Sequence, residues 1–137
     1  METGNLRVDA ETAFARQRRR RRWGRAGRLP SLTEALGAAP PAHRRATGLE
    51  AIPLESIVGT TEPAKARVFD GRFRVPESSR HRWERLWIAS RKGASLPPIS
   101  VFRLGDRHYV DDGHHRVSVA HALGMVAIDA EVVDLNT

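Results

Sequence analysis

The 137-residue chain contains no cysteine. This excludes disulfides, thiolate metal sites and a cysteine nucleophile, and it suits a reducing cytosol. The chain has no run of about 18 apolar residues, so we expect no helix that spans a membrane. The first residues also lack the apolar core of a secretion signal. We therefore predict a cytoplasmic protein without a membrane partner.

Acidic residues are scarce at the start of the chain. Residues 1–50 contain 11 arginines and 5 acidic residues, whereas residues 51–137 contain 12 basic and 11 acidic residues. The net charge of +7 therefore comes mainly from the first part. Such asymmetry is typical of a polyanion-binding arm on a globular body. We predict an Arg-rich helical arm and linker over residues 1–48, and a folded domain over residues 49–137.

Five consecutive arginines form the centre of this arm. Asp9 is a candidate cap for a helix that continues through Phe14 into the arginine run. Like charges four residues apart repel, so the phosphates of a nucleic-acid backbone would stabilise the helix. The predicted nucleic-acid-binding residues are Arg18, Arg19, Arg20, Arg21 and Arg22. We therefore predict nonspecific DNA binding and association with the nucleoid. Trp23 could stack on a base.

Two alternatives exist for the arm. Charge runs are often only solvated, disordered tails. Binding to an anionic membrane is less favoured, because few apolar residues accompany the charges. The sequence alone does not decide between a tail and a nucleic-acid-binding helix.

The segment after the arginines contains a short predicted helix and a linker. A Ser-x-x-Glu pattern that begins at Ser31 predicts a capped helix that ends at Gly37. Residues 38–48 include two consecutive prolines and are typical of a linker. Apolar residues alternate around Pro53, which predicts an edge strand because proline cannot donate to a neighbouring strand.

The remaining elements determine the fold class. Trp83 and Trp87 recur at helical spacing, which predicts a helix over residues 77–92 with both rings in the core rather than stacked on bases. Residues 60–75 lack a clear period and are predicted to be a loop. Alternating apolar residues predict three more strands, over residues 99–104, 108–110 and 127–133. The predicted class is α+β, a small mixed sheet with packed helices preceded by the basic helical arm.

The most informative stretch is residues 111–116, Asp-Asp-Gly-His-His-Arg, between a predicted strand and a predicted helix. Free N–H groups and the dipole at a helix start attract anions. Gly113 lets the backbone approach a ligand closely, and the planar guanidinium of Arg116 can bind two phosphate oxygens. We predict a nucleotide phosphate site formed by Asp112, Gly113, His114, His115 and Arg116.

Ordinary turn chemistry is the alternative for this stretch, since Asp before Gly is common in turns. Arg116 could then simply pair with Asp111 or Asp112. The histidines show no metal-ligand spacing, so we predict no metal held by the protein itself. Mg²⁺ could arrive with a nucleotide, bound by its phosphates and one of these aspartates.

From residue 52 onward, the order of motifs resembles the ParB/sulfiredoxin superfamily. The similarity is carried by residues 52–57, 83, 96–101, 109–116 and 128–133. The resemblance implies a small α+β domain whose Gly-x-x-Arg turn, here Gly113 to Arg116, binds nucleotide phosphates. ParB proteins of this superfamily bind and hydrolyse CTP and clamp DNA, but their turn is Gly-Glu-Arg-Arg.

Other members of the superfamily imply different chemistry. Sulfiredoxins have a catalytic cysteine where His114 stands, so their reaction is excluded. The turn is most similar to that of free-serine kinases, whose phosphoryl transfer also needs an acid from an earlier loop. Glu62 is the candidate for this acid. His115 is a second catalytic candidate, because a histidine can act as acid and base near neutral pH.

Three functions follow as hypotheses. The favoured one is a ParB-like module, chromosome-partitioning or regulatory, that binds CTP, ATP or ADP and associates with DNA through the arm. The second is a small phosphotransferase or NTPase, similar to the free-serine kinases. The third is a partner-binding domain with a vestigial pocket. A homodimer is one possible assembly.

Overall fold

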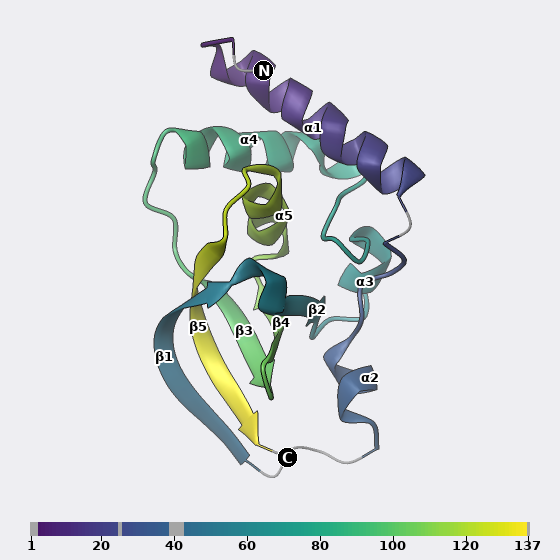
Figure 1. The fold of residues 1–137 in the computed structure, drawn as a ribbon, viewed down its shortest axis with the longest axis vertical. Helices are drawn as coiled ribbons and strands as arrows, with labels where there is room; N and C mark the ends of the chain where they lie inside the picture. Colours follow the sequence, from purple (N-terminus) through teal and green to yellow (C-terminus); the bar gives the residue numbers. More distant parts are fainter. Residues whose placement is uncertain (1–2, 25, 39–42, 137) are drawn as a thin grey trace.

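The computed structural model describes residues 3–24, 26–38 and 43–136. These residues form a five-stranded mixed sheet of order β1-β5-β3-β4-β2, with helices gathered at one end and along one side (Figure 1). The predicted α+β class is confirmed. No helix among the described residues is long and apolar enough to cross a membrane.

The first strand forms one edge of the sheet, as the proline pattern predicted. β1 (His43–Pro53) pairs antiparallel with β5 (Ala127–Asn136). The register shifts between Ala46 and Gly48, and Gly48 adopts φ +88°, a conformation that glycine adopts easily at a bulge.

The expected linker is therefore partly wrong, because residues 43–48 are the first half of β1. Their sequence, His-Arg-Arg-Ala-Thr-Gly, shows no apolar alternation. The backbone pairing with β5 defines the strand instead, and that pairing leaves no pattern in the side chains. Residues 39–42 of the expected linker lie outside the described residues.

The centre of the sheet is a hairpin. β3 (Ile99–Leu104) and β4 (Arg107–Asp112) pair antiparallel around the predicted turn at Gly105. β3 also runs parallel to β5, and the short strand β2 (Ile57–Thr60) runs parallel to β4 at the second edge. The 3-10 turn η1 (Leu54–Ser56) connects β1 to β2.

Two helices share the hydrophobic core with the sheet. α4 (Arg80–Arg91) follows the 3-10 turn η2 (Glu77–Ser79), and α5 (His114–Ala122) follows β4. Trp83 of α4 is fully buried, and its indole N–H donates to Ser118 Oγ of α5 at 2.9 Å. Trp87 is also buried, so both tryptophans of α4 are core residues, as predicted.

The arginine-rich helix packs on the rest of the molecule. α1 (Leu6–Trp23) lies along α4 at one end of the fold (Figure 1). The buried Phe14 ring meets the Trp83 ring edge-on, with the ring centroids 5.5 Å apart. The Asp9 cap is wrong, because Asn5 caps the helix and the Asp9 carboxylate accepts bonds from Thr3. The division of the chain at residue 48 stays a prediction, yet α1 and the sheet share one core.

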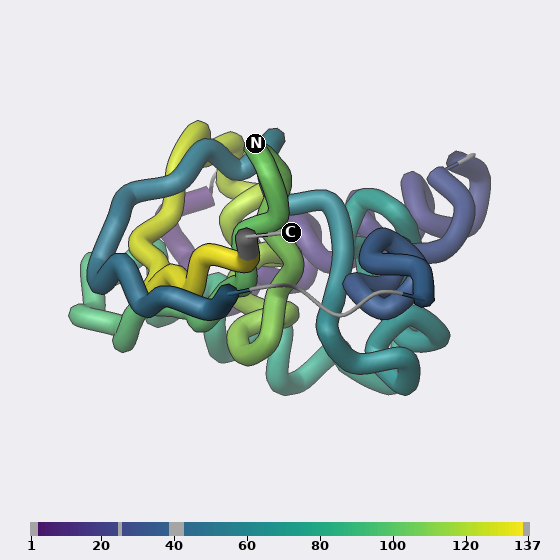
Figure 2. Tube along the Cα trace, turned by 90° about the horizontal axis from the view of Figure 1, so that it is seen from below, coloured from purple at the N-terminus to yellow at the C-terminus, as the bar shows by residue number. Residues whose placement is uncertain are grey.

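Two short helices complete the fold. α2 (Leu32–Leu36) begins as predicted, with Ser31 Oγ accepting from the backbone N–H of Glu34 at 3.1 Å. α3 (Lys65–Val68) lies in the segment expected to be a loop. That segment is held by Phe69 and Phe73, both buried. Figure 2 shows β1 and α2 on opposite sides of the molecule when it is viewed from below.

Candidate functional site

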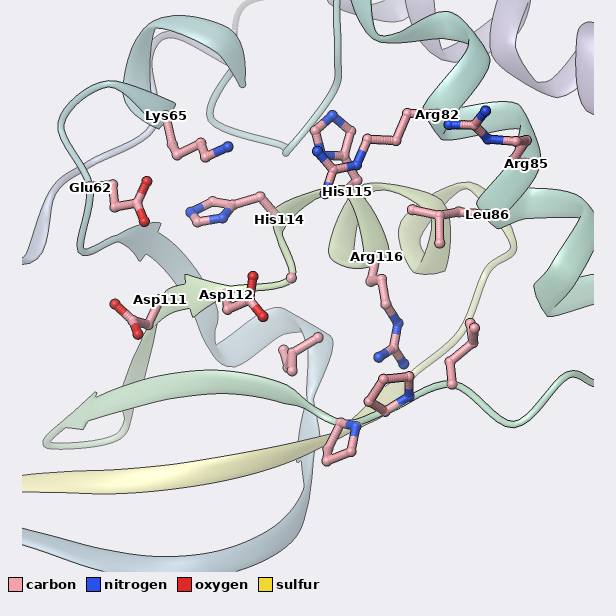
Figure 3. A pocket seen from close by; sticks show the side chains of 15 residues that line it. Glu62, Lys65, Arg82, Arg85, Leu86, Asp111, Asp112, His114, His115 and Arg116 are labelled. Carbon is pink, nitrogen blue, oxygen red and sulfur yellow. The ribbon is translucent and has the colours of Figure 1, made fainter.

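A cavity of about 580 Å³ opens where α5 begins (Figure 3). Its walls come from the segment around α3, the first turns of α4, the entry to β3 and the turn between β4 and α5. It contains every residue of the predicted phosphate site, together with the predicted catalytic residue Glu62. The lining residues are Glu62, Lys65, Arg82, Arg85, Leu86, Leu96, Pro97, Pro98, Ile99, Asp111, Asp112, Gly113, His114, His115 and Arg116.

Gly113 is the residue that shapes the turn. Its φ of +114° is left-handed, and a Cβ on it would lie 2.8 Å from Cβ of Ile99 and clash with the Ile99 side chain. Only glycine fits both constraints, which explains the glycine in the Gly-x-x-Arg pattern.

No side chain in the described part of the chain caps the start of α5. The first N–H groups of a helix have no partner within the helix, and here they belong to His114, His115 and Arg116 at the cavity wall. Asp111 is not the cap either, because its carboxylate accepts from Thr61 Oγ1 at 2.8 Å. The helix start therefore presents free N–H donors and the positive end of its dipole to the cavity.

The imidazole of His114 is buried. Its Nε2 lies 2.7 Å from Oγ1 of Thr60, and its ring packs beside Phe69 with centroids 5.4 Å apart. Burial, and then the nearby Lys65 ammonium, lower the pKa of His114 to about 4. His114 is thus neutral at pH 7, and its ring is held by Thr60.

His115 is held in a similar way on the other side of the turn. Its Nε2 lies 3.4 Å from Ser79 Oγ, and its ring meets Phe69 edge-on. Burial, followed by the positive charges of Arg82 and Lys65, lowers the pKa of His115 to about 4. Neither imidazole is a charged donor at pH 7, so an anion at this turn would meet mainly the backbone N–H groups of these two residues. The expected titration of the pair near neutral pH does not fit these low pKa values.

Arg116 projects from the first turn of α5 on the side away from the His115 ring (Figure 3). Partial burial lowers the pKa of its guanidinium, whereas Asp129 and Asp112 raise it. Among the described residues Arg116 forms no ion pair within 4.0 Å. The alternative in which it simply pairs with Asp111 or Asp112 is therefore not what the structure shows.

Three further cations line the cavity, and the sequence reading missed them. Lys65 comes from α3, and Arg82 and Arg85 from α4. Within the described ranges none of them has an ion-pair partner, unlike Arg80, which pairs with Glu77 and Glu84. The spacing of three between Arg82 and Arg85 places both on one face of α4. That spacing was the one sequence pattern that linked the two arginines, but it does not show that this face of α4 lines a cavity.

Carboxylates occupy one side of the cavity. Glu62, Asp111 and Asp112 lie on the side toward β4 (Figure 3). Across residues 3–24, 26–38 and 43–136, no group of three or more His, Asp or Glu side chains could hold a metal ion. A magnesium ion would therefore need the oxygens of a bound phosphate to complete its ligands, with one or two carboxylates from this side.

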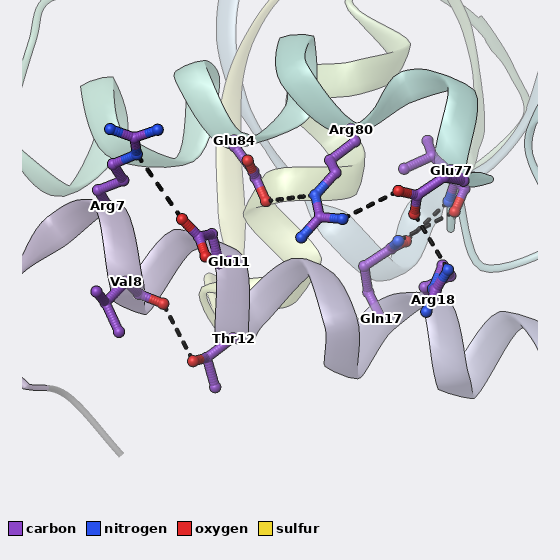
Figure 4. Close-up of polar contacts among 10 residues, drawn as sticks. Arg7, Val8, Glu11, Thr12, Gln17, Arg18, Glu77, Arg80 and Glu84 are labelled. Carbon is purple, nitrogen blue, oxygen red and sulfur yellow. Dashed lines mark hydrogen bonds and ion pairs between the residues drawn. The ribbon is translucent and has the colours of Figure 1, made fainter.

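The predicted nucleic-acid-binding arginines all lie on α1, near its end. Arg18 pairs with Glu77 at 3.2 Å (Figure 4), and the partly buried Arg21 donates to the Val68 carbonyl at 3.0 Å. Arg19, Arg20 and Arg22 are exposed. The side chain of Trp23 is 77% exposed and stands beside Arg22. The exposed surface of this helix end is thus cationic, while Arg21 is used within the fold.

Comparison with known proteins finds similarity among solved structures only. No family model and no curated protein matches the chain. Among solved structures, the chain is similar to the sulfiredoxin from Arabidopsis thaliana, with 23% sequence identity over 61% of this chain and 82% of that chain and a TM-score of 0.45. The likeness is one of fold only, of the sulfiredoxin type that the motifs predicted, and it does not place the chain in the ParB/sulfiredoxin superfamily. It assigns no role to any residue of the cavity.

Proposed function

We propose that the chain is a nucleotide-binding module whose phosphate site is the start of α5. The observation that carries the proposal is the uncapped helix start, which opens into a cavity lined by four cations without ion-pair partners among the described residues. The cations are Lys65, Arg82, Arg85 and Arg116. An anion there would accept the free N–H bonds and offset the repulsion among these charges.

The cavity also has room and surface for the rest of a nucleotide. Its volume is within the roughly 300–1,000 Å³ typical of small-molecule sites. Leu86, Leu96 and Pro98 supply apolar surface beside the cations, which suits a nucleoside attached to phosphates. The candidate ligands are CTP, ATP and ADP, with Mg²⁺ carried by the phosphates.

The second part of the proposal is nonspecific DNA association through α1. The exposed Arg19, Arg20 and Arg22 form a cationic surface at the end of a helix that is anchored by the buried Phe14. An anchored helix positions its arginines with less loss of conformational entropy than a free tail would. Each phosphate neutralised would add about 0.9 to the log–log salt slope of binding.

A thermal-shift panel tests the nucleotide site. Wild type and Arg116→Ala are heated with CTP, ATP, ADP or GTP, with and without Mg²⁺. At a ligand concentration of about one hundred times Kd, binding adds about 2.7 kcal/mol to the free energy of unfolding, so Tm rises by several degrees. Arg116→Ala should lose most of that rise, whereas Arg107→Ala, at an exposed residue of the β3–β4 hairpin, should keep it. If no nucleotide changes the Tm of the wild type, the nucleotide site is refuted and the partner-binding hypothesis remains.

A second function is favoured by the position of Glu62. This exposed carboxylate shares the cavity with the helix start, where an acid that accepts a hydroxyl proton is needed for phosphoryl transfer. Incubation with labelled ATP or ADP and free serine tests a phosphotransferase, and release of phosphate tests an NTPase. Turnover that Glu62→Gln abolishes, with the nucleotide-induced Tm shift retained, would establish the enzyme. Binding without turnover would leave the module alone.

A further inference from the structure

A second cationic hollow lies at the other end of α5. It is a cavity of about 180 Å³ between α1, the segment 70–75 and the last turn of α5. His121 follows Gly113 by eight positions, so the two residues are about 12 Å apart along the helix axis at 1.5 Å per residue. The cavity is lined by Gln17, Arg20, Arg72, Arg74, Ser118, His121 and Ala122.

The floor of this hollow is rigid and its polar groups are satisfied. Gln17 is buried, and its amide exchanges two bonds with the backbone of Val75, at 2.8 and 3.0 Å. Ser118 Oγ accepts the indole N–H of Trp83. The ring of His121 stacks on Phe73, with centroids 6.3 Å apart. These contacts join the three segments, so the backbone positions that carry the cationic side chains are fixed relative to one another.

The cations of the hollow face no acidic lining residue. Arg74 donates to the Arg20 carbonyl at 2.7 Å, which draws the two segments together. The nearest carboxylate, Asp70, accepts the backbone N–H groups of Arg72 and Arg74 at 2.9 Å, and lies 3.9 Å from the Arg74 guanidinium. The side chains of Arg20 and Arg72 have no ion pair in the described part of the chain. Guanidiniums from two separate segments therefore converge beside the His121 imidazole, and Asp70 offsets only part of their positive charge.

We infer that this hollow binds one phosphate group of a nucleic-acid backbone. Guanidiniums match the oxygens of a phosphate in geometry as well as in charge. The volume is below the roughly 300 Å³ at which small-molecule sites begin, so it suits a single anionic group rather than a whole nucleotide. Arg20 belongs to the same exposed helix end as Arg19 and Arg22, so a backbone that follows α1 would reach the hollow. This inference rests on the proposed DNA association and extends it from the arm to the body.

The test compares two exposed arginines. Binding of a fluorescein-labelled duplex is measured by anisotropy over a series of salt concentrations, for wild type, Arg72→Ala and Arg107→Ala. Arg72 is exposed and its side chain makes no hydrogen bond that the described fold needs, so the variant should fold. Loss of one phosphate contact should lower the log–log salt slope by about 0.9 for Arg72→Ala, whereas Arg107→Ala, in the β3–β4 hairpin, should keep the wild-type slope.

A second readout locates the phosphate. The imidazole signals of His121, assigned with His121→Gln, are followed by NMR while duplex DNA or inorganic phosphate is added. A shift of the His121 signals when the duplex is added supports the inference. A shift with inorganic phosphate alone would make this a free-anion site and overturn the inference. Equal salt slopes for the two variants would overturn it while leaving DNA binding by α1 intact. A wild type that binds no duplex would refute both, and the nucleotide-induced Tm shift would still report separately on the cavity at the start of α5.

Discussion

Nε2 of His114 lies 2.7 Å from Oγ1 of Thr60, a hydrogen bond that joins the start of α5 to the end of β2. It fixes the position of the ring within the wall of the cavity, and burial keeps that ring neutral at pH 7 by lowering its pKa to about 4. The helix start is consequently fixed before any ligand arrives, and the donors that face the cavity are backbone N–H groups and guanidiniums. Preorganised donors of this kind bind an anion with little reorganisation.

Stability should fall as the pH is lowered from 6.5 to 4. Burial lowers the pKa of both His114 and His115 from an ordinary 6.5 to about 4. In this range the unfolded chain binds the proton and the folded chain does not, so acid favours unfolding. Each ring accounts for at most about 3 kcal/mol across the window. Urea unfolding at a series of pH values measures the effect, and His114→Gln should flatten the slope. A free energy of unfolding that is constant from pH 6.5 to 4 would contradict it.

Gly113→Ala should destabilise the protein and abolish nucleotide binding. A left-handed φ costs an L residue about 1–2 kcal/mol, and the added Cβ would also collide with Ile99. Gly93→Ala is the matched control, because Gly93 has φ +74° with open space around it. Urea unfolding should show a larger loss for Gly113→Ala than for Gly93→Ala. Equal losses would mean that the close approach to Ile99 is not present in solution.

Phe14→Ala should show that α1 is part of the folded core. The ring is 1% exposed, and truncating a buried phenylalanine typically costs about 3–5 kcal/mol. Trp23→Ala is the control, because its 77% exposed ring should contribute within about 0.5 kcal/mol. Both are measured by urea unfolding. If α1 were a detached tail, neither substitution would change the free energy of unfolding.

Nucleotide binding should raise the pKa of His115. The positive charges of Arg82 and Lys65 now contribute to its low value of about 4, and a phosphate among those cations would reduce their effect. The pKa is measured by NMR titration of the ring with and without ADP. Arg116→Ala, titrated at the same ADP concentration, should show a much smaller rise. An unchanged pKa in a protein saturated with ADP would place the phosphates elsewhere.

The turn and the hairpin could be predicted from the sequence because their signals are local. Gly105 lies between two alternating apolar runs, and Gly113 lies between a strand pattern and a helix pattern. Ser31 capped its helix as predicted for the same reason. Asp9 does not cap its helix, because Asn5 offers the same capping chemistry one turn earlier. The sequence does not rank two cap candidates that lie one turn apart.

The character of the site depends on contacts between distant segments, which no local pattern reveals. His114 and His115 were expected to present their rings to a phosphate, but Thr60, Ser79 and Phe69 enclose those rings. The cations from α3 and α4 reach the cavity only because these helices pack beside the start of α5. The sequence therefore predicted the turn at which the cavity opens, but not which cationic side chains line that cavity.

We expect the phosphates of a nucleotide to bind the free N–H groups at the start of α5. The most direct measurement is a ¹H–¹⁵N spectrum of the full chain titrated with CTP, ATP, ADP or GTP in the presence of Mg²⁺. At least one nucleotide should move the amide signals of His114, His115 and Arg116 most, and Arg116→Ala should weaken the response. Saturation by a nucleotide that leaves these three amides unmoved, or no response to any nucleotide, would contradict it.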